Sequence, residues 1–265
     1  MPSTEENLRA WGEAASWVEG GDEWSSVWGS AEAQWHGSLL PRVRRYLPTG
    51  TLLEIAPGHG RWTQFLLQNC DRLIGIDIST SAIDVCKERF ADQSHAEFHA
   101  NDGRSLDVVT DGSVDLAFSF DSMVHVETDV LGGYLAELAK KLNDTGVAFI
   151  HHSNLGAFGR LFEVFARVPP PLRRPLLARG IIDQRHLRAT SVSAAWFAAT
   201  CDEVGLRCVG QELVNWGGRR LIDCISVVTR PGAAIDRPNL VVPNPRFMAE
   251  AESIRLASTV HTPKV

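Results

Sequence analysis

Five short apolar runs alternate with stretches of helical periodicity between residues 51 and 151, and this alternation restricts the chain to few folds. Most of the runs are apolar on both faces, which is typical of strands in a parallel sheet that helices cover on both sides. We therefore expect an α/β fold with a mostly parallel sheet. The predicted strands are residues 51–56, 72–77, 95–100, 113–120 and 146–151.

The alternation changes after residue 190. A helix is predicted over 192–204, followed by strands at 206–214 and 219–229, with the link Asn215-Trp-Gly-Gly218 between them. A link this short permits only an antiparallel hairpin. The sequence thus predicts seven strands, the last two antiparallel.

Three segments lie outside this pattern. Residues 1–36 hold five of the eight tryptophans and are predicted to form a helical cap. The main domain, 37–230, is interrupted at 153–190 by a predicted helical lid, which contains three consecutive prolines and seven arginines, with one amphipathic helix at 155–168. Residues 231–265 are predicted to be an extended tail with a short helix near 248–256. Because this tail is too polar to bury alone, we expect it to wrap a second copy of the chain in a homodimer.

Composition narrows the possible partners. The 265 residues carry a net charge of −6, which argues against a nucleic-acid partner. No apolar run approaches the ~20 residues of a membrane-spanning helix, so no membrane partner is expected. The acidic start of the chain lacks a secretory leader, and the five scattered cysteines form no Cys-x-x-Cys pair. We expect reduced thiols and a cytoplasmic protein.

Loops with ligand-binding chemistry follow three consecutive strands, at the sheet edge where open α/β sheets bind ligands. The segment Glu54-Ile-Ala-Pro-Gly58-His-Gly60 follows the first strand, and its glycines let a ligand approach the backbone. Asp77 ends the second strand and could accept both hydroxyls of a ribose, although it could also simply initiate the next helix. Asn101-Asp102-Gly103 follows the third strand, where an aspartate can meet an adenine amino group. Together the loops predict an adenosine ligand.

Several adenosine ligands are excluded. No lysine completes a phosphate-binding P-loop, and Thr63 stands where a dinucleotide fold has its third glycine. The Tyr-x-x-x-Lys pair of short-chain dehydrogenases is missing as well. Glu54 would repel a pyrophosphate but suits a ligand that carries an amino group or a sulfonium.

These motifs resemble those of class I S-adenosylmethionine-dependent methyltransferases, over about residues 50–152 by motif and 191–230 by topology. The family motif, acidic-x-Gly-x-Gly-x-Gly, departs here in having Ala56 for its first glycine and Pro57 before the second. The resemblance implies a Rossmann-like fold and S-adenosylmethionine as the cofactor. It places Gly58 and Gly60 at the methionine moiety and Asp77 at the ribose. The implied cofactor contacts are Glu54, Ala56, Gly58, Gly60, Trp62, Asp77, Ile78, Asn101, Asp102, Gly103 and Phe120.

A narrower likeness concerns the acceptor. Residues 118–127 and 151–154 are similar to bacterial methyltransferases that are encoded with glycan and natural-product glycosylation pathways. This likeness implies an O-methyltransferase acting on a saccharide or glycoside. Two alternatives stay open: an N- or O-methyltransferase of a small aromatic metabolite, and a nucleotide-binding protein without turnover.

A sugar hydroxyl is a poor nucleophile at neutral pH, so a general base is expected beside the methyl group. The candidates are Asp121, His125, His151 and His152. Adjacent residues on a strand point to opposite faces, so only one of His151 and His152 can face the substrate. We expect His152 in that role, because it lies one step further out of the sheet.

Acceptor contacts are expected from His125, which also orients the cofactor loop, and from the segments outside the core fold. From those segments, the expected acceptor contacts are Trp28, Arg160 and Arg185. The other candidates there are the remaining arginines of 153–190, namely Arg167, Arg173, Arg174, Arg179 and Arg188.

A metal site is conceivable, because Asp121, Glu127 and Asp129 could supply oxygen ligands. Acids at the start of a helix are equally explained by the helix dipole. We expect no metal.

Overall fold

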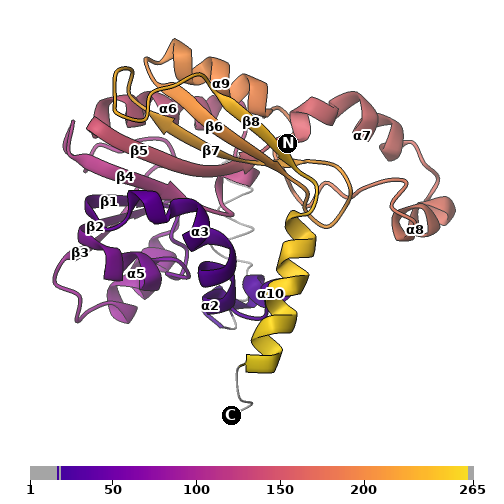
Figure 1. Cartoon of the computed structure of the whole chain (residues 1–265), viewed down its shortest axis with the longest axis horizontal. Coiled ribbons are helices and arrows are strands. Elements are labelled where there is room, and N and C mark those ends of the chain that lie inside the picture. The colour runs from indigo at the N-terminus through magenta and orange to yellow at the C-terminus, as the bar shows by residue number, and fades with distance from the viewer. Residues whose placement is uncertain (1–16, 18, 262–265) are drawn as a thin grey trace.

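The computed structural model describes residues 17 and 19–261, which form one twisted sheet with helices on both faces (Figure 1). The sheet has eight strands in the order β3-β2-β1-β4-β5-β7-β6-β8. Strands β1 to β5 are parallel, and β7 runs antiparallel to both β5 and β6. The strands are β1 (Thr49–Ile55), β2 (Cys70–Asp77), β3 (Ala96–Ala100), β4 (Val114–Ser119), β5 (Leu142–Ser153), β6 (Arg207–Val214), β7 (Asp223–Thr229) and β8 (Leu240–Asn244).

The sheet separates two apolar cores. Alternation along β1 sends Leu53 and Ile55 into one core and Leu52 into the other. The first core lies under α6 (Thr128–Lys141) and α9 (Ala194–Glu203). The second lies under α5 (Thr80–Arg89) and the short helices α3 (Leu40–Val43) and α4 (Thr63–Leu66), and α2 (Ala31–Gln34) precedes them in the chain. The strands are therefore apolar on both faces because helices cover both sides of the sheet, as predicted. Short 3-10 helices, with one π-helix at η3, complete the elements: η2 (Asp22–Trp28), η3 (Trp35–Leu39), η4 (Arg44–Tyr46), η5 (Leu67–Asn69) and η6 (Met123–His125).

The α/β prediction is confirmed, with one correction to the strand count. An eighth strand, β8, comes from the predicted tail and pairs in parallel with β6, from Gly210↔Leu240 to Val214↔Asn244. The tail continues into α10 (Phe247–His261), and Phe247 is fully buried. The segment therefore folds onto its own chain and is not an extended arm.

The predicted hairpin forms, but its link is longer than the sequence indicated and covers residues 215–222. Asp183 is the reason. Its carboxylate accepts the backbone N–H of Arg220 at 3.1 Å and pairs with the guanidinium of Arg220 at 2.9 Å. These contacts hold Arg220 out of the strand.

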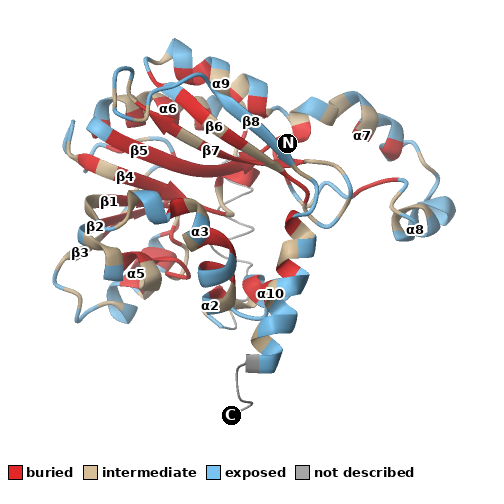
Figure 2. Ribbon diagram, viewed as in Figure 1, coloured by how far each residue is buried: buried red, intermediate tan, exposed pale blue. Residues whose placement is uncertain are grey.

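The predicted lid contains two helices after the turn η7 (Leu155–Phe158), where the sequence indicated one. They are α7 (Gly159–Ala166) and α8 (Pro170–Ala178), and together they extend away from the body of the molecule (Figure 1). Much of this segment is exposed (Figure 2). Within residues 17 and 19–261, no helix has both the length and the apolar character needed to cross a membrane.

Candidate functional site

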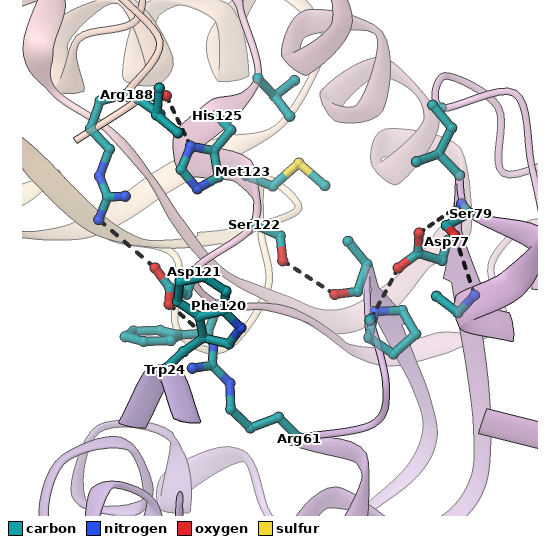
Figure 3. Close-up of a pocket in the computed structure, with 18 of the residues that line it drawn as sticks. Trp24, Arg61, Asp77, Ser79, Phe120, Asp121, Ser122, Met123, His125 and Arg188 are labelled. Atoms are coloured by element: carbon teal, nitrogen blue, oxygen red, sulfur yellow. Dashed lines mark hydrogen bonds and ion pairs between the residues drawn. The ribbon is translucent and has the colours of Figure 1, made fainter. Parts of the chain in front are cut away.

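A cavity of about 1010 Å³ opens at the carboxyl ends of β1, β2 and β4 (Figure 3). Its walls also include parts of η2, the β6–β7 link and α10. A volume at the upper end of the range for ligand pockets leaves room for a cofactor and an acceptor together.

Asp77 forms the base of one half of the cavity. Its carboxylate accepts the backbone N–H groups of Gly58 at 3.0 Å and Ser79 at 2.9 Å, and burial raises its pKa. Ser79 is the N-cap of α5, since its hydroxyl accepts the N–H of Ala82 at 3.2 Å. Because another residue caps the helix, the carboxylate of Asp77 is not needed for that task.

The loop after β1 keeps the backbone conformation of a glycine-rich loop, although alanine stands at the position of the first glycine. Ala56 adopts a φ of 61°, in the left-handed region that glycine prefers. Gly58 lines the cavity, whereas Gly60 faces Phe90, whose ring lies 2.5 Å from the position of an added Cβ. Packing against Phe90 thus requires glycine at position 60, and the contact of Gly60 with the cofactor stays a prediction.

Glu54 lies behind this loop rather than on the cavity wall. It is 1% exposed and accepts the hydroxyl of Thr63 at 2.6 Å. Burial raises the pKa of Glu54 to about 8, and nearby Asp77 raises it further against the effect of the Thr63 bond. The carboxyl is thus largely protonated at neutral pH, and the predicted direct contact with the cofactor is corrected to support of the loop.

The raised pKa of Glu54 has a measurable consequence. A carboxyl with an unfolded pKa near 4.5 and a folded pKa of about 8 stabilises the fold below pH 4.5, and this stability is lost as the pH rises through 8. The Glu54→Gln variant keeps the polar contact and cannot titrate. We expect the melting temperature of the unmodified protein to fall relative to this variant between pH 4.5 and 8, measured by calorimetry. Parallel curves for the two proteins would contradict the assignment.

In the loop after β3, the side chains of Asn101 and Asp102 form hydrogen bonds to the backbone of the same loop. The Asn101 amide donates to the carbonyl of Ser105 at 2.7 Å, and its oxygen accepts the N–H of Gly103 at 2.9 Å. Asp102 is exposed and accepts two backbone N–H groups, which lower its pKa. Neither side chain lines the cavity, whereas Gly103 does. The adenine contacts of Asn101 and Asp102 stay predictions.

The cavity contains donors that fit the cofactor implied by the sequence. Arg61 Nη1 and Trp62 Nε1 are buried without a hydrogen-bond partner among the described residues, and both residues line the cavity. Two unpaired donors suit a carboxylate, which the methionine moiety of S-adenosylmethionine carries. Asp77 at the base suits the ribose hydroxyls. Ala56, Gly58, Trp62, Ile78, Gly103 and Phe120 are the other predicted contacts that line the cavity.

The Asp77→Asn variant tests the ribose contact without a change of size. Loss of a charge-assisted hydrogen bond costs about 1.5–3 kcal/mol, so we expect S-adenosylhomocysteine to bind roughly 10- to 150-fold more weakly by titration calorimetry. The Asp84→Asn variant, an exposed carboxyl on α5, is the matched control. Equal affinities for the two variants would remove Asp77 from the site.

A chain of ion pairs forms the other half of the cavity (Figure 3). Asp121 follows β4 with a φ of 67°, and its carboxylate lies 3.1 Å from Arg61 and 3.8 Å from Arg188. Arg188 also pairs with Asp223 of β7 at 2.8 Å, and its guanidinium lies over Trp216 at 4.9 Å. Burial opposes ionisation of Asp121, but Arg61 and Arg188 outweigh it and hold its pKa below the ordinary value. Asp121 is therefore ionised at neutral pH.

The predicted base His152 is in the wrong place. Its ring is fully buried against Phe197 of α9 at 4.0 Å, and its two nitrogens contact the Ser153 carbonyl and the Ser226 hydroxyl, each at 2.8 Å. Burial lowers its pKa to about 3. The ring lies in the core on the face of α9 and does not line the cavity.

His151 points to the opposite face, as the alternation predicted, but it too is fully buried behind the wall. Its ring stacks on Phe120 at 4.4 Å. Nδ1 accepts the backbone N–H of Asp121 at 3.2 Å, so in the neutral ring Nε2 carries the proton and lies 3.4 Å from Asp223. His151 therefore positions Asp121 and has no access to an acceptor.

Of the three predicted site histidines, His125 is the one that lines the cavity. Its Nδ1 bonds to the carbonyl of Leu187 at 2.9 Å, which fixes the proton on that nitrogen. Burial and the neighbouring Arg188 lower its pKa to about 4, so the ring is neutral.

The remaining predicted acceptor contacts do not reach the cavity. Trp28 is fully buried beside Trp216 and Phe247, because it fills the core between η2 and α10. Arg160 and Arg185 are exposed outside the cavity. Of the seven arginines of 153–190, Arg188 is the one on the wall.

Two wall residues, Trp17 and Trp24, come from the tryptophan-rich cap, whose rings the sequence offers as acceptor contacts. Sequence reasoning missed Trp216 of the hairpin link and Met248 of α10, which no signal in the sequence indicated. Residues 1–16 and 18 of the predicted cap, including Trp11, lie outside the described residues. Within the described part, no group of three or more His, Cys, Asp or Glu side chains is arranged to hold a metal ion.

Comparison with known proteins gives this geometry a context. Residues 52–146 match the family model described as "Methyltransferase domain". A protein from Pyrococcus horikoshii has a TM-score of 0.55 at 17% identity, over 84% of this chain and 95% of that one. An S-adenosylmethionine-dependent methyltransferase from Clostridium acetobutylicum gives 0.54 at 14% identity, over 76% and 92%. Another from Mesorhizobium loti gives 0.53 at 14% identity, over 75% and 98%.

No curated protein sequence matches the chain significantly. The domain match covers strands β1 to β4, whose loops build the cofactor half of the cavity, and the structural neighbours share the fold. Residues 52–146 therefore match a methyltransferase domain, and the chain shares its fold with the S-adenosylmethionine-dependent methyltransferases from Clostridium acetobutylicum and Mesorhizobium loti.

Proposed function

We propose that the protein transfers the methyl group of S-adenosylmethionine to a hydroxyl of a saccharide or glycoside. The observation that carries this proposal is the ionised Asp121 on the cavity wall, held between Arg61 and Arg188. An ionised carboxylate accepts a hydroxyl proton in a hydrogen bond, and the adjacent guanidinium groups can bind further hydroxyls.

Tryptophan faces give the second support. Trp24 and Trp216 both line the cavity, and the Trp216 ring lies under the guanidinium of Arg188 at 4.9 Å. Flat apolar rings beside charged hydrogen-bonding groups match the mixed surface of a sugar, which has an apolar ring face and a polar edge.

The residues favour positioning over strong base catalysis. The bound cofactor supplies an electrophilic methyl group on a sulfonium. Asp121 accepts the hydrogen bond of the acceptor hydroxyl and fixes the direction of its lone pair, and such alignment accounts for much of the rate in a displacement reaction. As the new O–C bond forms, the hydroxyl proton becomes strongly acidic, so a carboxylate of low pKa suffices to receive it. His125, whose ring is neutral, lies on the same wall as the ionised Asp121.

The direct test is incubation of the protein with methyl-labelled S-adenosylmethionine and a panel of saccharides, glycosides and phenols. Label on a sugar hydroxyl, located by mass spectrometry, supports the proposal. Labelling confined to phenols or to nitrogen would overturn it.

The tryptophan-rich wall also favours a second candidate, transfer to a small aromatic metabolite that stacks on Trp24 or Trp216. The two candidates differ in their dependence on Asp121. An acceptor held by stacking keeps most of its binding when Asp121 is replaced, whereas a sugar hydroxyl loses its hydrogen-bond acceptor.

A further inference from the structure

The arm formed by α7 and α8, residues 159–181, is the part of the molecule least explained by the fold. It projects from the body (Figure 1), and α8 contains no buried residue. Its attachment is a small separate core in which Phe162 and Phe165 contact Leu155, Ile182 and Ile222. Because the arm contributes little to the two main cores, the stability of the fold does not explain its presence.

The arm is strongly basic. It carries five arginines and a single acid, Glu163, in a chain whose net charge is −6. All five guanidinium groups are exposed, and among the described residues none of them has a carboxylate within ion-pairing distance. These arginines are Arg160, Arg167, Arg173, Arg174 and Arg179.

Aliphatic side chains lie among these arginines on the surface. Val164 is 56% exposed, Leu172 55% and Ile181 51%. The aromatic rings of the arm face inward instead, since Phe162 and Phe165 are buried. The exposed surface therefore combines guanidinium groups with aliphatic groups and presents no exposed aromatic ring among its described residues.

We propose that the arm binds the surface of an anionic lipid bilayer. Arginines bind lipid phosphates, and aliphatic groups on short amphipathic helices enter the boundary between headgroups and acyl chains. Charge complementarity alone would also suit RNA. RNA-binding surfaces stack bases on aromatic rings, and they gain nothing from exposed valine, leucine and isoleucine. An anionic bilayer, in contrast, binds both the guanidinium groups and the aliphatic side chains of this surface.

The arm leads directly to the cavity. The segment that follows it contributes His186, Leu187 and Arg188 to the wall, and Leu187 is 68% exposed. A protein held on a bilayer by the arm would therefore have one rim of its cavity close to the lipid surface. This inference does not depend on the identity of the methyl acceptor.

The test is co-sedimentation of the full chain with vesicles of phosphatidylcholine alone and with vesicles that contain phosphatidylglycerol. We expect binding to the anionic vesicles, weakened by salt, and little binding to the neutral ones. The Arg173→Glu/Arg174→Glu variant should bind at least about tenfold more weakly. The matched control is Arg44→Glu/Arg45→Glu, an exposed adjacent pair in η4 at the opposite end of β1, which should bind within about twofold of the unmodified protein.

A Leu172→Ser variant separates the aliphatic contribution from the charge. It should weaken binding to anionic vesicles even at high salt, where a purely electrostatic contact is already lost. Absence of binding to anionic vesicles, or equal losses in the two charge variants, would overturn the proposal. So would binding of a fluorescent single-stranded RNA that is lost in Arg173→Glu/Arg174→Glu while no vesicles are bound.

Discussion

Replacement of Asp121 by asparagine should lower methyl transfer to a saccharide by about 100-fold or more. The amide keeps the size of the side chain but removes the negative charge that faces Arg61 at 3.1 Å and Arg188 at 3.8 Å. The acceptor hydroxyl then loses both its orienting acceptor and the group that receives its proton. Turnover under saturating cofactor, measured with labelled S-adenosylmethionine, gives the effect.

Two measurements keep this prediction specific. The affinity for S-adenosylhomocysteine should change far less than turnover, because Asp121 lies in the acceptor half. The Asp202→Asn variant, an exposed carboxyl of α9 that pairs with Arg207, is the control and should keep full turnover. Turnover of Asp121→Asn within tenfold of the unmodified protein would remove Asp121 from the chemistry.

The second large effect concerns stability at the Arg188–Asp223 pair. Both side chains are at most 4% exposed, and Arg188 donates to both carboxylate oxygens. Although burial alone would raise the pKa of Asp223, Arg188 and His151 hold it far below the ordinary value. Removal of one member leaves a buried uncompensated charge, so Asp223→Asn and Arg188→Gln should each lower the free energy of unfolding by about 3–5 kcal/mol.

The double variant Arg188→Gln/Asp223→Asn distinguishes this cause from general damage. With both charges removed, no ion is left buried without a partner, and the loss of stability should be clearly smaller than the sum of the single losses. Urea unfolding of the three variants measures the coupling. Strictly additive losses would show that the two groups do not act as a pair.

The sequence predicted the order of the elements well, because the apolar runs of β1 to β5 depend on local pattern and on burial at both faces. It predicted Asp77 for the same reason, since the end of a parallel strand fixes where a side chain must lie. It missed β8: the residues Leu240–Asn244 contain a proline and lie among polar residues, and the strand forms only because the edge of β6 is available.

The errors in the site have a common cause. Strand alternation correctly put His151 and His152 on opposite faces, but it does not say which face holds α9 and which the cavity. The packing of Phe197 on His152 decides this, and Phe197 lies 45 residues away in sequence. The ion pairs of Asp121 depend likewise on Arg61 and Arg188, whose separation gave no local signal.

The wall of the cavity is built from segments that the ribosome synthesises early and late. Trp24 comes from the first thirty residues and Met248 from the last twenty, and the guanidinium of Arg42 bridges Glu212 of β6 and Glu250 of α10 at 2.7 and 2.9 Å. The strands of the cofactor half are complete once the ribosome has passed Ser119 at the end of β4, whereas the acceptor half also needs α10. A nascent chain can therefore assemble its nucleoside-binding loops well before it has an enclosed place for a second substrate.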